Sequence, residues 1–583
     1  MRVPFLLALV SLSAWAQPSP ETQLTMTSLR SGEKQRLIGA LGPAEEIPLY
    51  RAQLEIDPDK RTVTGKVYVT FPVKKKALSS LLLRVPPNAS GKRITLRNAM
   101  ASGAPTTVEQ PEPTLYKVKL EPAVPVGGAA EIELRLDAVI PAAGKDSDNF
   151  NSAAVNGGSS SGESDYGAFS AAPEVISLAG LLPVVPPTGA DGQPWPGPSG
   201  IGDLAEFDPS NFLVSVTVPS AYRVVAPGNQ LGEVPQQGGK TQFAYGISGA
   251  RDFAMFVTKG YEMTSKKSGD VTVEAYYLAA DSASGKKVLQ YAVDSLAEYE
   301  KHFSPYPWTT FRVVEARLTG GAGGMEFPGM VSVSTALFRG AADPLAALGM
   351  PGLGSNPAMG DLLGDLKPLL EKTLEFTIAH EVAHQWFAIM VGNDPIREPV
   401  VDEPLTQHAA LLYMEWKHGK KTADVMRDAQ LKAAYQVMRM MGGEDAIADR
   451  PTNEFESTNE YAAVIYGKAP MLFDALRKQT GDGLYFAALK SYVDSYRWKN
   501  ASDVGFTTEL AKASPGQGKS IEKLRRHWWL EKHGDEDIGQ GDLGALFGGA
   551  LGGQTGQGVQ GLDKETQQLL EEAIKALGGG TGF

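Results

Sequence analysis

Alternating apolar and polar residues are the main pattern in the first half of the chain. Leu54 and Ile56 alternate with charged residues, and a similar alternation continues through 63–71. It returns at 132–136 and at 212–218, where every second residue is apolar. A period of two places alternate side chains on one face of a strand. The pattern therefore predicts half-buried antiparallel strands, which together favour a β-sandwich.

Helical periodicity replaces this alternation in the second half. A predicted strand at 271–277, a helix at 283–302 and a strand at 311–316 precede it, and from 366 to 530 the period is mainly helical. We therefore predict a multidomain α+β protein. The predicted domains are an N-terminal antiparallel β-sandwich, 46–261, and a mainly helical domain, 262–536.

The first sixteen residues have the features of a secretory signal peptide. Arg2 provides a short basic start, an apolar run follows at 4–15, and Ala14-Trp15-Ala16 matches a small-x-small cleavage site. We expect 1–16 to be removed and the mature protein to be exported, to a periplasm or out of the cell. The apolar run is too short to span a bilayer comfortably, so no stable membrane insertion is expected after removal of the signal.

Three further segments have a composition unlike that of the predicted domains. Residues 17–45 are polar and mixed, which is typical of a linker. Residues 341–364 are rich in Gly, Pro, Met and Ala and look like an insertion or flap. The end of the chain, 537–583, is Gly-rich, with one candidate amphipathic helix at 563–577.

Composition and charge limit the kinds of partner. The 583 residues are 42% hydrophobic, which is ordinary for a globular protein, and the net charge is -12. An acidic chain is a poor ligand for nucleic acid or an anionic membrane surface, so neither is expected as the main partner. The chain has no cysteine. Packing alone must therefore stabilise it, which a chain of this length can achieve.

The strongest chemical signal is an H-E-x-x-H motif. His380 and His384 are four residues apart in a helical stretch, so both can reach one metal ion, with Glu381 beside it. The surrounding residues are apolar, and burying two imidazoles and a carboxylate among them is costly without partners. A metal ion would supply those partners.

A third metal ligand follows at the right place. Glu403 comes after eighteen intervening residues and opens a second helical run, which a Gly- and Pro-containing loop separates from the first. A pair of helices with a carboxylate there completes a His-His-Glu site and leaves a fourth position open for water. The sequence thus predicts one Zn²⁺ per chain, held by His380, His384 and Glu403, with Glu381 as general base.

These residues resemble the aminopeptidase N family of gluzincin zinc metallopeptidases. The run 380–387 reads H-E-V-A-H-Q-W-F, and Asp402-Glu403 stands eighteen residues beyond it. The resemblance extends from about 48 to 535. It implies a thermolysin-like fold for the helical domain and a short form without the C-terminal helical-repeat domain of that family.

The resemblance also implies roles for residues outside the metal motif. Gly324-Met325-Glu326, preceded by Gly323, resembles the family's G-x-M-E segment, in which the carboxylate binds the substrate amine. Tyr461 and Tyr466 resemble its tyrosine pair. We expect Tyr466 to donate a hydrogen bond to the oxyanion and Tyr461 to form part of the site wall. The expected substrate-binding residues are Gly323, Gly324, Met325, Glu326 and Tyr461.

Three positions depart from the family pattern. Phe327 stands where Asn is usual, Pro404 where Gly is usual, and His408 where Tyr is common. These changes do not affect the metal ligands, but they could affect substrate choice.

Three functions are consistent with these residues. The first is a zinc aminopeptidase acting on peptide substrates, which the resemblance favours. The second is a gluzincin endopeptidase with relaxed recognition of the substrate's end. The third is a non-enzymatic β-sandwich scaffold with a structural zinc, which the filled catalytic positions disfavour.

Overall fold

The structure is a computed structural model. It describes residues 18–143, 166–189, 191–194, 207–320, 322–340 and 357–540, with only the backbone described for 357–366. Three predicted features lie wholly or largely outside these residues and stay predictions. They are the signal peptide at 1–16, the insertion at 341–364 and the tail at 537–583 with its candidate helix.

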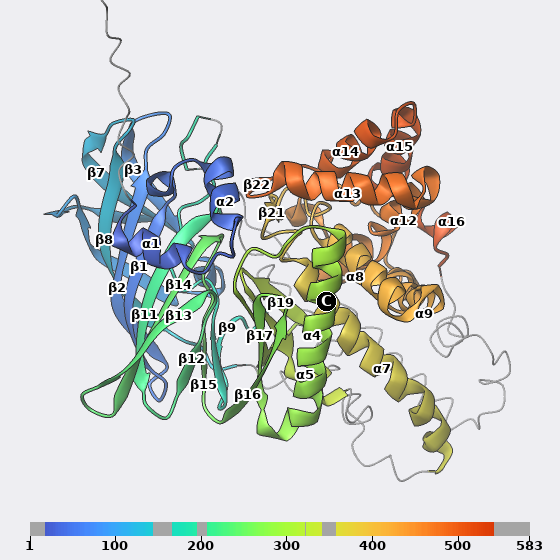
Figure 1. Ribbon diagram of the computed structural model, residues 1–583, viewed down its shortest axis with the longest axis horizontal. Helices are drawn as coiled ribbons and strands as arrows, with labels where there is room; N and C mark the ends of the chain where they lie inside the picture. The colour runs from blue at the N-terminus through green and yellow to red at the C-terminus, as the bar shows by residue number, and fades with distance from the viewer. Residues whose placement is uncertain are drawn as a thin grey trace, which may run out of the picture.

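The N-terminal part of the chain is β-rich, on the left in Figure 1. Its largest described sheet has the strand order β13-β14-β11-β1-β2-β8-β4-β5, and smaller sheets have the orders β3-β7-β6 and β12-β15-β10-β9. The first two strands are β1 (Leu49–Asp57) and β2 (Thr62–Pro72). The others are β3 (Leu78–Arg84), β4 (Ile94–Ala101), β5 (Ala104–Pro105), β6 (Val108–Glu112), β7 (Leu115–Val124), β8 (Ala129–Val139), β9 (Phe169–Ala171), β10 (Val175–Leu178), β11 (Ser210–Pro219), β12 (Arg223–Val225), β13 (Asn229–Gln236), β14 (Lys240–Ala250) and β15 (Phe256–Thr258).

The alternation in the sequence explains which face of the large sheet is buried. In β2, Val63, Val67 and Val69 are buried, whereas the intervening Thr64 and Lys66 are exposed. Neighbouring strands of this sheet are antiparallel except for one parallel pair, β1 with β11. The predicted β-rich domain followed by a mainly helical one is therefore confirmed.

The second domain begins with a mixed sheet and one long helix. The strand order is β16-β17-β18-β20-β19, so β19 is an edge strand. Figure 1 shows α4 in front of this sheet, between the β-rich and the helical parts. The bounds are β16 (Tyr261–Ser268), β17 (Val271–Leu278), α4 (Ser282–His302), β18 (Thr310–Ala316), β19 (Gly324–Phe327), β20 (Met330–Ser334) and α5 (Thr335–Gly340).

Helices make up most of the remaining described chain. The two that carry the metal motif are α7 (Pro357–Ala383) and α8 (Glu403–His418). The rest are α9 (Lys420–Met426), α10 (Ala433–Met440), α11 (Thr458–Tyr461), α12 (Met471–Thr480), α13 (Asp482–Tyr496), α14 (Gly505–Ala513), α15 (Gly518–Arg525) and α16 (Gly534–Asp537), with π-helical turns η5 (Arg427–Lys432), η7 (Ala462–Lys468) and η8 (Arg526–Leu530) and the short pair β21 (Val391–Gly392) and β22 (Lys499–Asn500). Within the described residues, none of these helices has the length and apolarity needed to cross a membrane.

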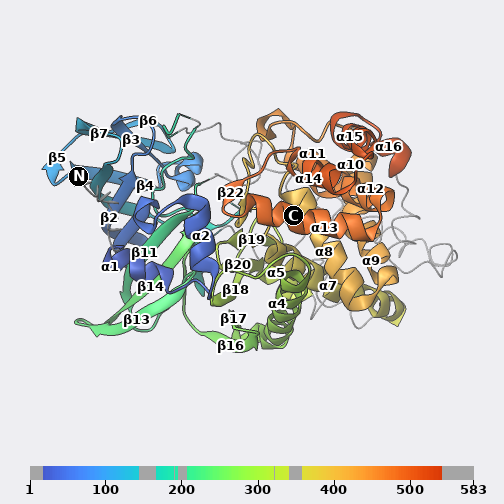
Figure 2. The ribbon, with the colours of Figure 1, turned by 45° about the horizontal axis from the view of Figure 1, so that its top comes forward.

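The segment 17–45 differs from the linker that its polar composition predicts. Residues 20–41 contain two helices, α1 (Pro20–Met26) and α2 (Glu33–Leu41). Ser19 caps α1 by accepting a hydrogen bond from the backbone N–H of Thr22. Figure 2 shows α2 between the large sheet and β22. The polar composition was misleading for two reasons. Few apolar residues suffice to pack these two helices, and the buried charge of Glu33 is paired rather than solvated.

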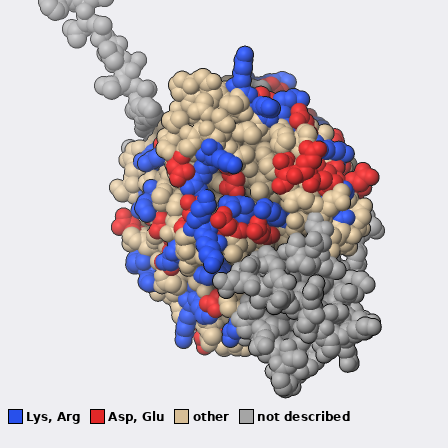
Figure 3. All heavy atoms as spheres, turned by 90° about the vertical axis from the view of Figure 1, so that its right-hand side faces the viewer, with Lys and Arg blue, Asp and Glu red and all other residues tan. Residues whose placement is uncertain are grey.

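Charges of both signs occur on the described part of one face. Figure 3 shows a band of Lys and Arg side chains down its middle and a group of Asp and Glu side chains toward its right edge.

Candidate metal and catalytic site

The last turn of α7 carries His380 and Glu381, and His384 follows directly after the helix. His380, Glu381 and His384 are almost fully buried, and the backbone N–H of His384 bonds to the carbonyl of His380 just past the end of the helix. Ile378, Val382 and other apolar side chains surround them. The helix therefore presents a small polar group inside an apolar environment.

Glu403 reaches the same place from the start of α8. Asp402 caps this helix through its carboxylate, which accepts a hydrogen bond from the Glu403 backbone N–H at 2.9 Å. The Tyr299 hydroxyl on α4 donates to the Ala379 carbonyl of α7 and the Ala409 carbonyl of α8, at 3.0 and 3.1 Å. These bonds hold the two helices at a fixed separation.

The three predicted metal ligands converge on one point. Nε2 of His380 and Nε2 of His384 are 3.1 Å apart, and each lies 3.3 Å from Oε2 of Glu403. These atoms form a nearly equilateral triangle. Tetrahedral zinc with bonds of about 2.0–2.2 Å requires ligand separations of about 3.3–3.6 Å, so the donor set fits this metal.

Hydrogen bonds outside the triangle support the same conclusion. Nδ1 of His384 lies 3.0 Å from the Phe387 carbonyl and therefore carries the proton, which leaves Nε2 free to bind a metal. Two neutral Nε2 atoms in contact would repel each other, and a cation between them removes this conflict. His380, His384 and Glu403 thus form a buried site suited to one zinc ion.

The electrostatics of the metal-free chain agree with a cation site. Burial alone would lower the pKa of His384, but Glu326 and Glu403 raise it well above its usual value. Burial opposes ionisation of Glu403, yet His384 and His380 hold its pKa far below the usual range. In the absence of a metal ion, a proton on the His384 imidazole supplies a positive charge that balances the nearby carboxylates.

A second group of potential ligands lies on the surface of the C-terminal region. His527, Glu531 and His533 are close together but only half-buried. His527 is paired with Asp537 at 2.7 Å and His533 with Glu536 at 3.0 Å. Since carboxylates already satisfy both imidazoles, this group is a weaker metal candidate.

Glu381 lies against β19, where glycine is required. A Cβ on Gly324 would lie 2.2 Å from Oε1 of Glu381, too close for any side chain. Oε2 of Glu381 is buried and has no hydrogen-bond partner among the described residues. Burial raises the pKa of Glu381 well above its usual value. The strand thus confines a carboxylate that is poised to take up a proton.

Gln385 fixes β19 relative to the zinc helix, a role that sequence reasoning missed. Its side-chain amide donates to the Phe327 carbonyl at 3.0 Å and accepts from the Gly329 backbone N–H at 2.8 Å. Gln385 is fully buried. Its place directly after His384 was the only available signal, because both partners are backbone atoms distant in sequence.

The predicted substrate-binding segment lies beside the triangle. Glu326 is on β19, on the same face as Gly324, which lies directly against Glu381. The Gly323 carbonyl accepts from the Ser334 backbone N–H at 2.9 Å, and Met325 packs against an apolar cluster. One edge of β19 pairs with β20, while the other edge pairs with no described strand.

The departures from the family pattern have local explanations. The Phe327 side chain is buried in an apolar cluster next to Phe256, on the opposite face of the strand from Gly324 and Glu326. Pro404 occupies the first turn of α8, where a missing backbone N–H costs nothing. His408 is buried beside Asp474, at 3.4 Å.

The two tyrosines lie on neighbouring turns. Tyr461 ends α11, and Tyr466 is in η7, the π-helical turn before α12. The Tyr466 hydroxyl donates to Oε1 of Glu403 at 2.6 Å, whereas the Tyr461 ring packs against Phe455 and Tyr466. Lys468 anchors this turn through 2.9 Å bonds to Asp445 and two carbonyls. Of the two phenols, the structure therefore brings that of Tyr466 to the metal ligands.

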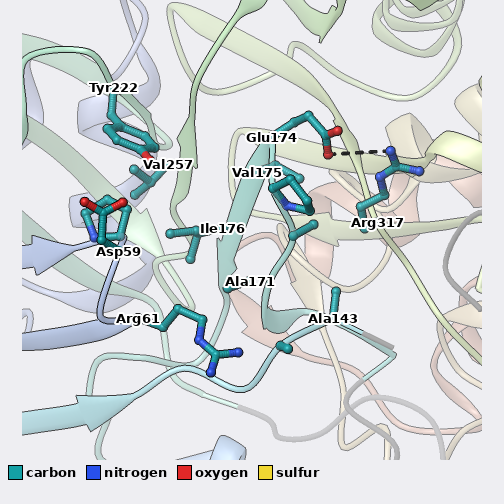
Figure 4. A pocket seen from close by; sticks show the side chains of 14 residues that line it. Asp59, Arg61, Ala143, Ala171, Glu174, Val175, Ile176, Tyr222, Val257 and Arg317 are labelled. Atoms are coloured by element: carbon teal, nitrogen blue, oxygen red, sulfur yellow. Dashed lines mark ion pairs between the residues drawn. The ribbon is translucent and has the colours of Figure 1, made fainter. Parts of the chain in front are cut away.

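A hollow of about 610 Å³ lies away from the metal site. Its lining includes Asp59, Arg61, Glu174, Tyr222 and Arg317, as Figure 4 shows. Glu174 and Arg317 form an ion pair at 3.5 Å across it. None of the residues predicted for the metal site lines this hollow.

Comparisons with known proteins agree with this geometry. Residues 365–528 match the model of the peptidase family M1 domain. A search of curated proteins found no match. The M1 zinc metallopeptidase from Deinococcus radiodurans has a similar structure, with a TM-score of 0.54 and 18% identity over 83% of this chain and 93% of that one. A two-domain M1 zinc metallopeptidase mutant bound to L-tryptophan gives 0.56 and 18%, over 83% and 94%.

The fold and the His-His-Glu site are those that the gluzincin resemblance implies. The match to the peptidase family M1 domain model spans the metal motif and the helices that follow it, and the similar M1 structures share the fold over 83% of this chain. The predicted resemblance is thereby confirmed at the level of this family.

Proposed function

We propose that this protein is a zinc aminopeptidase that removes the first residue from peptide substrates. The observation that carries the proposal is the triangle of His380, His384 and Glu403 with an unpartnered Glu381 beside it. The M1 domain match supports the same reaction class. One similar M1 structure, a mutant of the Deinococcus radiodurans protein, is bound to a Tyr-Ser-Ala substrate.

The reaction follows from what each side chain can do. Zinc held by His380, His384 and Glu403 would polarise the scissile carbonyl and acidify water. Glu381 accepts a proton from the attacking water and delivers it to the leaving amine as the C–N bond breaks. Tyr466 donates a hydrogen bond to the oxygen on which negative charge develops.

Glu326 supports exopeptidase rather than endopeptidase action. It is a partly exposed carboxylate on β19, on the same face as Gly324, which lies against Glu381, so it can pair with the ammonium of the substrate's first residue. The unpaired edge of β19 can bind an extended peptide through backbone hydrogen bonds. A substrate fixed in this way is cut one residue from its end.

Metal analysis and kinetics of single variants test the assignment. His380→Ala, His384→Ala and Glu403→Ala should each lose zinc. Glu381→Gln should retain zinc and lose turnover, because the general base is not a ligand. Wild-type zinc content in all three ligand variants would refute the site.

The substrate's free end is tested separately. The wild-type protein should hydrolyse aminoacyl-arylamides, and a chelator should abolish this activity, while N-acetylated peptides should be poor substrates. Equal hydrolysis of blocked and free peptides would favour the endopeptidase, and zinc binding with no hydrolysis of either would favour the scaffold.

We also propose that the protein is exported and works on peptides outside the cytoplasm. The sequence of 1–16 supports this, and the net charge of -12 supports peptides over nucleic acid as partners. N-terminal sequencing of protein from its native location should give Gln17, or a residue next to it, as the first residue. An intact Met1 would contradict export.

A further inference from the structure

A small cavity lies behind β19, where the β-rich domain meets the catalytic domain. Its volume is about 140 Å³. Apolar side chains, including Phe207, Ile389 and Pro395, form much of its wall. Three carboxylates, Asp252, Glu326 and Asp402, also line it. The described lining therefore combines apolar side chains with three carboxylates and the basic side chain of Arg251.

Asp252 lacks the partners that a buried charge normally has. It makes no hydrogen bond or ion pair with any residue that the structure describes, and its Oδ1 is buried. Burial and the charge of Glu326 raise the pKa of Asp252 to about 7. Asp402 is 2% exposed and caps α8 through Oδ1, whereas its Oδ2 has no hydrogen-bond partner among the described residues. A buried carboxylate without a partner calls for a cation.

Arg251 also lines the cavity, but its single positive charge is outnumbered by the three carboxylates, and its guanidinium is held by neutral oxygen acceptors. Nε donates to the Ile389 carbonyl at 2.8 Å, and one terminal nitrogen donates to the Phe207 carbonyl and to Oδ1 of Asn500, at 2.8 and 2.9 Å. Arg251 thus fastens the end of the β-rich domain to the catalytic domain. The next residue, Asp252, is thereby held at the cavity wall.

Glu326 links this cavity to the metal site. On β19 it shares a face with Gly324, which lies directly against Glu381, and it also lines the cavity together with Asp252. None of the three predicted metal ligands lines the cavity. In this order, Asp252 lies beyond Glu326 as seen from the ligands.

This order matches the dimensions of an amino-terminal basic residue. Its α-ammonium must stay close to the scissile bond, at Glu326. Its side chain branches from the adjacent carbon and can run onward, with an apolar stem along the apolar wall and a cationic end beyond.

We propose that this cavity receives the side chain of the substrate's first residue and that Asp252 pairs with its cationic end, which makes peptides beginning with Lys or Arg the preferred substrates. The inference rests on the proposed aminopeptidase function. It assigns Glu326 to the α-ammonium and Asp252 to the side chain, and the nearby Asp402 adds negative potential.

Kinetics of Asp252→Asn provide the first test, with arylamides of Lys, Arg, Ala and Leu as substrates. Loss of one charged hydrogen bond predicts a fall in kcat/KM of about 10–100-fold for Lys and Arg, with Ala and Leu nearly unchanged. Asp59→Asn, which removes a carboxylate from the other hollow, should change none of them. Zinc content and melting temperature show whether the variants are intact.

A second test uses inhibition of Ala-arylamide hydrolysis by L-lysine amide and L-norleucine amide. The two share the α-ammonium and differ at the end of the side chain. The wild type should bind the lysine compound more tightly, and Asp252→Asn should bind both alike. Equal loss with all arylamides, or an unchanged preference for lysine amide in Asp252→Asn, would overturn the inference. Turnover of Ala- and Leu-arylamides by the wild type tests the aminopeptidase function independently.

Discussion

Two roles can be distinguished for Tyr466: donating a hydrogen bond to the oxyanion and holding Glu403 in place. Its hydroxyl donates to Oε1 of Glu403 at 2.6 Å, and its ring lies 6.2 Å from that of His380. A neutral phenol has one proton to donate, so during the reaction Tyr466 would turn from Glu403 to the oxygen that becomes negative. The Tyr461 ring is buried against Phe455 and Tyr466, and its place in the site wall stays a prediction.

We predict that Tyr466→Phe lowers kcat by about 10²–10³-fold, the effect of losing one oxyanion donor. Zinc content and melting temperature should stay near those of the wild type. Tyr461→Phe should have a smaller effect on kcat. If Tyr466 only held Glu403 in place, its variant would instead lose zinc affinity and recover normal kcat at saturating zinc.

Asp449 makes the stability of the folded protein depend on pH, independently of the metal site. Burial and the nearby charge of Asp503 raise its pKa from 3.8 to about 7, although Arg525 lies 3.4 Å away. The folded protein therefore holds a proton that the unfolded chain releases at lower pH. Between about pH 4 and 7, this group makes the free energy of unfolding fall as the pH rises.

Asp449→Asn should consequently raise the melting temperature above pH 7 and change it little near pH 4. Asp535→Asn is the matched control of opposite sign. Arg439 lowers the pKa of Asp535 to about 2, so this carboxylate stabilises the protein above about pH 4, and its loss should be destabilising there. Parallel pH profiles for the two variants would contradict this assignment.

At the scale of elements, the site depends on β19 lying directly on the zinc helix. Gly324 faces Glu381 so closely that a Cβ would lie 2.2 Å from its carboxylate. We predict that Gly324→Ala displaces Glu381 or the strand and lowers kcat/KM by at least about 100-fold, the order expected when a catalytic group moves by 1 Å. Zinc should still bind, because the three ligands do not touch Gly324.

The matched control for this substitution is Gly483→Ala in α13. A Cβ there meets no atom within 4 Å, and alanine is the better helix former, so activity should be unchanged and stability equal or slightly higher. Normal activity of Gly324→Ala would mean that β19 can withdraw from Glu381 without consequence.

Periodicity and residue spacing in the sequence were sufficient to predict individual strands, helices and the metal ligands. Alternation located β1 and β2, and the helical period located α4. The spacing of His380, His384 and Glu403 was informative because residues four apart share a helix face. The same reasoning could not find the clamp by Gln385 or the position of Asp252. Their neighbours are distant in sequence, and only tertiary packing brings them together.

At the scale of the whole molecule, the N-terminal helices join the two domains. Arg497, which follows α13, donates to Glu33 of α2 at 2.6 Å and to Oγ of Ser304 at 2.8 Å. A Cβ on Gly249 would touch both Leu37 and Trp498, so α2, the large sheet and the catalytic domain meet at this point. Figure 2 shows α2 in this position. Together with Arg251, these contacts hold the β-rich domain against the zinc domain.

This arrangement predicts that a charge in the supposed linker is essential for stability. The side chains of Glu33 and Arg497 are 3% and 6% exposed. Removing one partner of such a buried pair leaves the other charge uncompensated and costs about 3–5 kcal/mol. Glu33→Ala should therefore lower the free energy of unfolding by about that amount in denaturant titrations.

The neighbouring helix offers a matched control, since Glu21 of α1 pairs with Arg51 at 3.4 Å with both side chains more than a third exposed. An exposed pair contributes only about 0.2–1 kcal/mol, so Glu21→Ala should be nearly neutral. A linker would tolerate both changes equally. Similar small effects of Glu33→Ala and Glu21→Ala on the free energy of unfolding would therefore show that α2 does not join the domains. A large loss of stability confined to Glu33→Ala, with metal content retained in the folded fraction, would establish that it does.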